Sequence, residues 1–129
     1  MYGSTDAELS ELIGKTLVSV TNKDNEEIVF VAADGSEYRL YHSQSCCESV
    51  TVEDIIGDLD DLVGAPIVMA EAVTSHDNPE DVTKEYQDSF TWTFYKFATV
   101  KGYVTVRWYG TSNGYYSESV DFIGPLQNL

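Results

Sequence analysis

The segment that decides the fold reads Phe90-Thr91-Trp92-Thr93-Phe94-Tyr95-Lys96-Phe97-Ala98-Thr99-Val100. Its side chains alternate as in a β-strand, with Phe90, Trp92 and Phe94 on one face and Thr91, Thr93, Tyr95 and Phe97 on the other. Lys101-Gly102 provides a turn, and Tyr103 to Tyr109 alternates again. Asn113-Gly114 is a type I′ hairpin signal that leads into a third strand over Tyr115 to Ile123. The last third of the chain therefore predicts an antiparallel meander.

A second meander is predicted near the start of the chain. The strand signals cover Thr16 to Thr21, Glu27 to Ala32 and Glu37 to His42. Asp34-Gly35 is a tight-turn pair between the last two of them. A further strand is expected from Ile67 to Thr74, followed by a polar loop from about 75 to 88, which we expect to be mobile.

Two short helices complete the predicted fold. Thr5 to Glu8 fits a capping box that would start a helix ending near residue 13. Thr51 to Asp54 fits a second box, and the apolar residues that follow it, up to Val63, share one helical face over about 52–63. We therefore expect one α+β domain over residues 1–129, in which two antiparallel β-meanders form a curved sheet or sandwich with the two helices on one face.

The charge is large and unevenly distributed. The formal net charge is -15 for 129 residues, whereas small soluble domains typically carry a magnitude of roughly 2 to 8. Residues 1–88 hold 20 acidic and 4 basic side chains, and residues 89–129 hold 2 and 3. This balance argues against direct binding of nucleic acid, which needs clustered Lys and Arg. It favours a basic partner, a bound cation, or a solubilising role.

The two cysteines, Cys46 and Cys47, are adjacent. A bridge between neighbours departs far from normal disulfide geometry, so we expect both to be thiols, as suits a cytoplasmic protein. Zinc ligation together with His42 and His76 is not favoured, because structural zinc sites use a Cys-x(2–4)-Cys spacing. No metal site, cofactor site or catalytic constellation is recognisable by spacing, and we expect a protein that is not an enzyme.

Carboxylates around the second predicted helix are the first candidate binding surface. Acidic residues at the end of a helix oppose its dipole and repel one another, although each effect amounts to only a few tenths of a kcal/mol. A solvated, solubilising face is the simpler interpretation. The alternative is a surface that imitates nucleic-acid phosphates or meets a basic protein. The residues proposed for it are Glu48, Glu53, Asp54, Asp58, Asp60 and Asp61.

An aromatic face of the last meander is the second candidate. The parity of the two strands predicts that Tyr95, Arg107 and Tyr109 share a face with neighbouring Thr and Tyr residues, and Tyr115 of the next strand is a further candidate. Such a face could bind a small ligand or nucleotide by stacking and by an ion pair from Arg107. The simpler interpretations are a face covered by the helices or a homodimer interface.

Several runs resemble a family of small acidic, uncharacterised proteins from tailed-phage and prophage genomes. They are Leu40 to Val50, Thr91 to Lys96 and Trp108 to Ser117. The resemblance brings no catalytic residues, but it implies a product acting in the cytoplasm of a bacterial host. We therefore expect a non-enzymatic host-takeover or anti-defence factor that engages a basic host protein, and neither a signal peptide nor a membrane span is evident.

Overall fold

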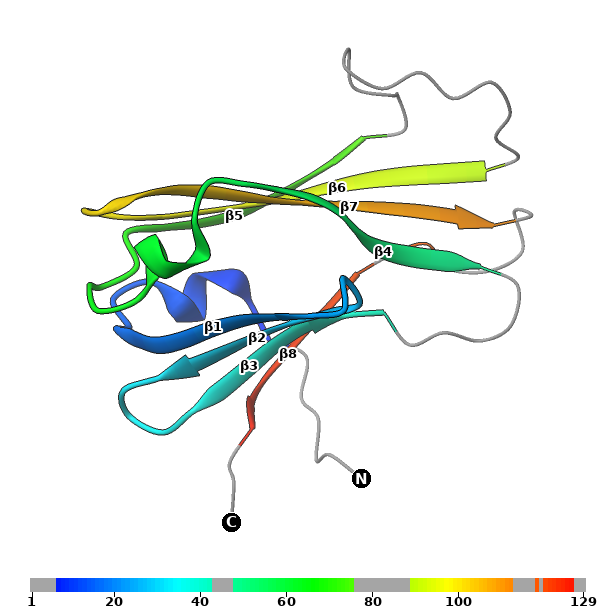
Figure 1. The fold of residues 1–129 in the computed structure, drawn as a ribbon. Coiled ribbons are helices and arrows are strands. Elements are labelled where there is room, and N and C mark those ends of the chain that lie inside the picture. Colours follow the sequence, from blue (N-terminus) through cyan, green and yellow to red (C-terminus); the bar gives the residue numbers. More distant parts are fainter. Residues whose placement is uncertain (1–6, 43–47, 76–88, 113–117, 119, 127–129) are drawn as a thin grey trace.

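The structure is a computed structural model that describes residues 7–42, 48–75, 89–112, 118 and 120–126. Its strands form two four-stranded antiparallel sheets, ordered β1-β2-β3-β8 and β4-β7-β6-β5, which lie face to face (Figure 1). Two single 3-10 turns, η1 and η2, accompany them. The elements are η1 (Leu9–Leu12), β1 (Leu17–Lys23), β2 (Glu27–Ala32), β3 (Glu37–Tyr41), β4 (Ser49–Ile56), η2 (Leu59–Leu62), β5 (Met69–Ser75), β6 (Ser89–Thr99), β7 (Gly102–Ser112) and β8 (Asp121–Leu126).

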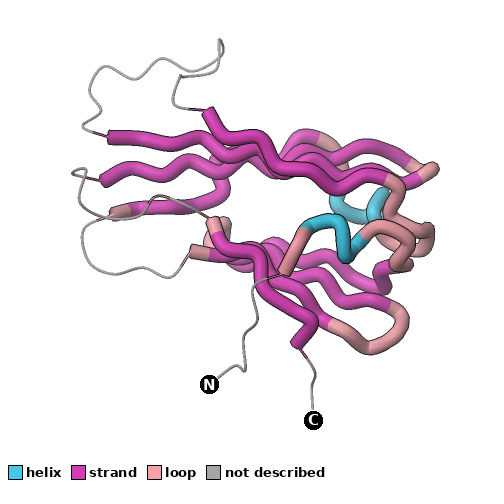
Figure 2. The backbone as a smooth tube through the Cα atoms, turned by 180° about the vertical axis from the view of Figure 1, so that it is seen from behind, coloured by secondary structure: helices cyan, strands magenta, loops and turns pink. Residues whose placement is uncertain are grey.

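The core fills the space between the sheets. Alternate residues of β7, namely Val104, Val106 and Trp108, are fully buried and belong to one apolar cluster with Phe30 of β2. The rings of Phe30 and Phe97 bridge the two sheets with centroids 5.3 Å apart. The helical turns lie between the sheets at one end (Figure 2), where each contributes a buried leucine to this core.

The α+β prediction is wrong, because the described chain is nearly all strand. The segment at 52–63 is β4 up to Ile56, followed by Gly57 at φ +108° and the η2 turn. A β-bulge between Val52 and Asp54 explains the error. It inserts an extra residue, so the inward side chains are Val50, Val52 and then Ile55, and a three-residue step replaces the strand period of two. That step imitates the spacing of a helical stripe.

The first predicted helix, at about 5–13, is also a short 3-10 turn. Within the described part of this segment only Leu9–Leu12 is helical, and the Glu8 backbone N–H donates to Glu11 Oε2 over 2.9 Å. The apolar residues that suggested a longer helix do not pack on one common face. Leu12 is buried in the core, whereas Ile13 is half exposed and forms an isolated β-bridge with Ile67.

The C-terminal strand joins the other sheet. The sequence predicts that Tyr115 to Ile123 continues the second meander, but β8 pairs with β3, and residues 113–117, with the expected hairpin, lie outside the described part. Phe122 stacks on Tyr38 of β3 with ring centroids 5.5 Å apart. The predicted loop at 75–88 likewise lies outside the described residues, except for Ser75. Among the described residues, no helix has the length and hydropathy needed to cross a bilayer.

The β2–β3 turn contains a carboxylate whose pKa is held well below its ordinary value. Asp34 Oδ1 accepts hydrogen bonds from the Ser36 hydroxyl and backbone N–H, and Asp34 Oδ2 accepts one from Lys15 Nζ over 2.9 Å. The hydrogen bonds from Ser36, followed by the one from Lys15, lower the pKa of Asp34. Its ionised form therefore stabilises the folded state.

We expect Asp34→Asn to lower stability near neutral pH and to lose this effect in acid. Because the folded-state pKa lies below the unfolded value of 3.8, the contribution is complete above that value and disappears as the pH falls through the folded pKa. Urea unfolding of both proteins at pH 6, 4, 3 and 2 measures it. Asp60→Asn, on an exposed turn, is the control and should stay within about 0.5 kcal/mol of the wild type. A difference between Asp34→Asn and wild type that does not change with pH would contradict the assignment.

Candidate functional site

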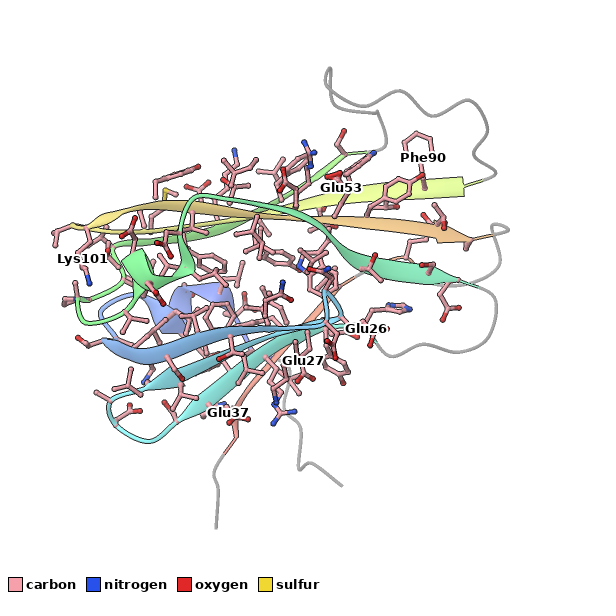
Figure 3. The ribbon with its side chains drawn as sticks, viewed as in Figure 1. Glu26, Glu27, Glu37, Glu53, Phe90 and Lys101 are labelled. Carbon is pink, nitrogen blue, oxygen red and sulfur yellow. The ribbon has the colours of Figure 1, made fainter. Side chains whose placement is uncertain are left out.

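The predicted acidic residues of β4 and η2 lie on the side of the sandwich that carries the edge strands β1 and β4 (Figure 1). The backbone N–H of Val52 donates to the carbonyl of Asn25 over 2.7 Å, which holds the β1–β2 turn against β4. Figure 3 shows Glu26 below the β4 ribbon and Glu53 above it. We call this surface the acidic edge and define it as Asp24, Glu26, Glu53, Asp54, Asp58 and Asp60.

Two members of the acidic edge, Glu53 and Asp54, flank Arg107 of β7. The Arg107 guanidinium donates from Nε and Nη2 to Glu53 Oε1 at 3.0 and 2.6 Å, and Asp54 Oδ2 lies 3.9 Å away. Only 8% of the Arg107 side chain is exposed, against 52% of the Asp54 side chain. Glu53 is therefore largely neutralised by Arg107, whereas Asp54 projects its charge into solvent.

The η2 turn carries the remaining predicted acids. Asp58 caps the turn by accepting a hydrogen bond from the Asp60 N–H over 2.9 Å, and Asp60 is exposed. Asp61 is half buried and its carbonyl accepts a hydrogen bond from Thr99 over 2.5 Å. Asp58 and Asp60 therefore extend the acidic edge, while Asp61 fastens η2 to the β6–β7 hairpin.

Glu48 does not belong to the acidic edge. Its side chain is only 2% exposed, and Glu48 Oε1 lies 3.3 Å from His42 Nε2, whose side chain is 5% exposed. A carboxylate buried in this way does not present its charge to an approaching protein. Its neighbours Cys46 and Cys47 lie outside the described residues, so the structure does not place the expected thiols.

The predicted ligand face is divided between the two sides of its sheet. Thr99 pairs with Gly102 across a two-residue turn, so odd-numbered residues of β6 pair with even-numbered residues of β7. Tyr95 therefore shares the inner face with Val106, whereas Arg107 lies on the outer face opposite Phe94. Burial raises the pKa of the Tyr95 hydroxyl, with a smaller contribution from Asp121. Tyr115 lies outside the described residues.

The outer face of this sheet instead brings Trp92 to Arg107 and Tyr109. The Trp92 and Tyr109 rings have centroids 4.4 Å apart, and the Arg107 guanidinium lies 5.4 Å from the Trp92 ring. Trp92 is fully buried. This arrangement leaves little of Arg107 accessible to an anionic ligand, because Glu53 and Trp92 already occupy it.

Residues 10–122 match the family model described as a domain of unknown function, DUF7448. The chain belongs to the DUF7448 family. No curated protein and no solved structure matches it. The DUF7448 match covers both sheets, from η1 to the start of β8. The acidic edge therefore lies within the family domain, as do Trp92, Arg107 and Tyr109 on the outer face of the second sheet.

Sequence reasoning missed two members of the acidic edge in this DUF7448 domain. Nothing in the sequence indicates that Asp24 and Glu26 lie near β4. In the structure both are exposed, and the turn that carries them is hydrogen-bonded to β4. Asp24 and Asn25 adopt positive φ values of 55° and 61°, as a type I′ turn requires. Only the packing of the two sheets brings this turn to β4.

Within the described part of the DUF7448 domain, no group of His, Cys, Asp and Glu side chains is arranged to hold a metal ion. Glu118 is a polar residue that sequence reasoning did not single out. Its carboxylate accepts hydrogen bonds from Thr91 over 2.8 Å and from Ser112 over 2.5 Å. Glu118, which precedes β8, is thereby tied to β6 and β7, and we assign it a structural role.

Proposed function

We propose that this protein is a non-enzymatic binding protein whose acidic edge engages a positively charged surface of another protein. The observation that carries the proposal is the acidic edge itself, in which carboxylates from a turn, an edge strand and a 3-10 turn lie along one side of the sandwich. In the described residues, no Lys, Arg or His nitrogen lies within 4 Å of the carboxylates of Asp24, Glu26, Asp58 or Asp60.

The distribution of cations supports the same proposal. Lys15 pairs with Asp34, and Lys23 and Arg39 pair with Glu27, all outside the acidic edge. Arg107 is the single partner of two members of the edge, Glu53 and Asp54, among the described residues. Lys101 donates to the Val63 carbonyl over 2.7 Å. The acidic edge is thus left with an uncompensated negative potential, which would steer a basic partner and raise its association rate.

The resemblance to phage proteins suggests the class of partner. A host nuclease or another nucleic-acid-handling protein presents a basic surface that normally binds phosphates, and carboxylates can occupy that surface in their place. Binding there would block access of the nucleic acid. We propose on this basis an anti-defence or host-takeover role in the host cytoplasm.

Neutralising the acidic edge should release the partner. The variant Glu26→Gln/Asp54→Asn/Asp60→Asn keeps the shape of each side chain, and the control Glu11→Gln/Asp34→Asn/Glu37→Gln changes the net charge equally at other sites. With partners captured from bacterial lysate by the wild type, we expect the edge variant to weaken binding at least about tenfold and the control to weaken it about twofold or less. Affinity is measured by titration calorimetry.

Salt provides an independent measurement on the same complex. The Debye length is about 10 Å at 0.1 M and about 3 Å at 1 M, so exposed charge pairs are screened over this range. We expect affinity to fall at least about tenfold between 0.05 and 0.5 M salt. Equal losses in the edge and control variants, or an affinity that does not change with salt, would contradict the acidic edge as the binding surface.

A further inference from the structure

Three of the four edge strands carry a feature that discourages pairing with another strand. β1 has a bulge between Leu17 and Ser19, and the Leu17 carbonyl accepts a hydrogen bond from Gly64 N–H over 2.9 Å. β4 has its own bulge and the charges of the acidic edge. β8 contains Pro125, and its Phe122 carbonyl accepts from Ala7 N–H over 2.9 Å. Bulges, charges, prolines and covering segments are the usual protections of sheet edges.

The fourth edge strand, β5, is less protected: its single charged residue is Glu71, and η1 contacts it only at the groove that the two elements line. It pairs with β6 in unbroken register from Met69 to Ser75, without a bulge, a proline or a basic residue. Residues 71–74 are all exposed. Within the described residues no further strand pairs with β5. Every second residue of such an edge directs its backbone N–H and carbonyl away from the sheet, where another strand can bind them.

A groove of about 460 Å³ runs along β5. It is lined by β5 on one side and by residues 7–10 on the other, with Tyr95, Val120 and Phe122 completing the lining. Ala70 and Ala72 are paired with Phe97 and Tyr95, so their small side chains face inward toward the groove and leave it open. The groove is therefore adjacent to the unpaired edge.

The charged groups of this groove are carboxylates. Glu8 and Glu71 are exposed residues that border it, but Glu71 pairs with Lys96, so its side chain points to the outer face of the sheet while Glu8 lies on the groove side. Lys96 lies opposite Glu71 in the β5–β6 register, but among the described residues no ion pair within 4 Å joins them. A strand added to β5 would direct alternate side chains toward this groove, where a basic side chain would meet Glu8. The intervening side chains would lie on the outer face, beside Glu71.

We propose that β5 and its groove form a strand-addition site for an extended, basic segment of a partner protein. Backbone hydrogen bonds to β5 supply affinity, and the groove selects a Lys or Arg at alternate positions of the added strand. A second copy of this chain is a less favourable occupant, because two chains of net charge -15 repel each other and would bring their groove carboxylates together. This site is separate from the acidic edge and does not depend on it.

Three capped peptides of equal charge and side-chain composition test the proposal. The first is (Lys-Thr)4, the second has four Lys followed by four Thr, and the third is (Lys-Thr)4 with an N-methyl group on every residue, which blocks both of its hydrogen-bonding edges. We expect the first peptide to bind at least about tenfold more tightly than the others, because only it combines alternation with a complete set of backbone donors. We also expect it to slow hydrogen exchange of backbone amides in β5.

Matched variants separate this site from the acidic edge. Glu8→Gln/Glu71→Gln should weaken binding of (Lys-Thr)4 about tenfold, whereas Glu26→Gln/Asp54→Asn, with the same change in net charge, should weaken it about twofold or less. Equal binding of the fully N-methylated peptide, or protection confined to β4, would overturn the proposal. Concentration-dependent dimerisation of the protein alone that protects β5 amides would also overturn it, because the edge would then be occupied by a second copy.

Discussion

Replacing Trp108 by Ala should be the most destabilising change in the core, lowering the free energy of unfolding by about 3 to 5 kcal/mol. Trp108 is fully buried on β7, opposite Val52 of β4 and Thr93 of β6, so its ring fills the centre of one sheet's inner face. Equilibrium unfolding in urea, followed by circular dichroism, measures the change.

Two further variants test whether the cost arises from lost packing. Val100 is 84% exposed at the β6–β7 turn, and Val100→Ala should change stability by no more than about 0.5 kcal/mol. The Trp108 Nε1 atom is buried without a hydrogen-bond partner among the described residues. Trp108→Phe should therefore cost clearly less than Trp108→Ala, because it removes no hydrogen bond and keeps a ring in place. Equal costs for the two substitutions would contradict this account of the core.

Replacing Gly57 by Ala should cost about 2 to 4 kcal/mol, the second large effect. Gly57 has φ +108°, and a Cβ atom there would lie 2.6 Å from the Tyr103 carbonyl oxygen and 3.3 Å from the Val104 Cα. Both obstacles belong to the backbone of β7, which is held by its neighbours on each side, so neither can move aside cheaply. Urea unfolding again provides the measurement.

Gly64 is the matched control for Gly57. It also has a positive φ, of +87°, but the atom nearest to a Cβ at this position would be the flexible Lys101 Nζ, at 3.8 Å. Gly64→Ala should therefore cost only the backbone strain, about 1 kcal/mol. The helix first expected over 52–63 makes the opposite prediction for Gly57, since Ala inside a helix stabilises by about 1 kcal/mol relative to Gly. A stabilising Gly57→Ala substitution would contradict the assignment of β4.

The local elements of the fold were predictable where the side-chain pattern was regular. The strand expected at Glu27 to Ala32 coincides with β2, and the alternation of residues 90–100 marks β6 to within one residue at each end. Asp34-Gly35 marks the β2–β3 turn, where Gly35 has φ +90°. These elements depend on the period of two and on turn residues, both of which are local properties of the sequence.

The errors arise where a single residue changes the register or where distant segments meet. The bulge at Val52 and Asp54 made a strand resemble a helix, and the two-residue turn after Thr99 placed Tyr95 and Arg107 on opposite faces. The pairing of β8 with β3 joins segments about eighty residues apart, which no local pattern reports. The number of residues in the turn therefore decides which side chains of two paired strands share a face of the sheet.

The candidate site was partly predictable for a similar reason. Acidic residues are visible in any sequence, but their environment depends on tertiary contacts. Glu48 is buried beside His42, Glu53 is paired with an arginine 54 positions away, and Asp24 and Glu26 reach β4 only through the Val52–Asn25 hydrogen bond. Sequence analysis therefore identified the excess of negative charge, and packing decides which carboxylates form the acidic edge.

Hydrogen exchange of the protein bound to its captured basic partner tests the acidic edge most directly. Backbone amides of the β1–β2 turn, β4 and η2 should exchange more slowly in the complex than in the free protein, and the effect should vanish in Glu26→Gln/Asp54→Asn/Asp60→Asn. Protection confined to β5 or to the outer face around Trp92, with unchanged exchange along the acidic edge, would contradict it.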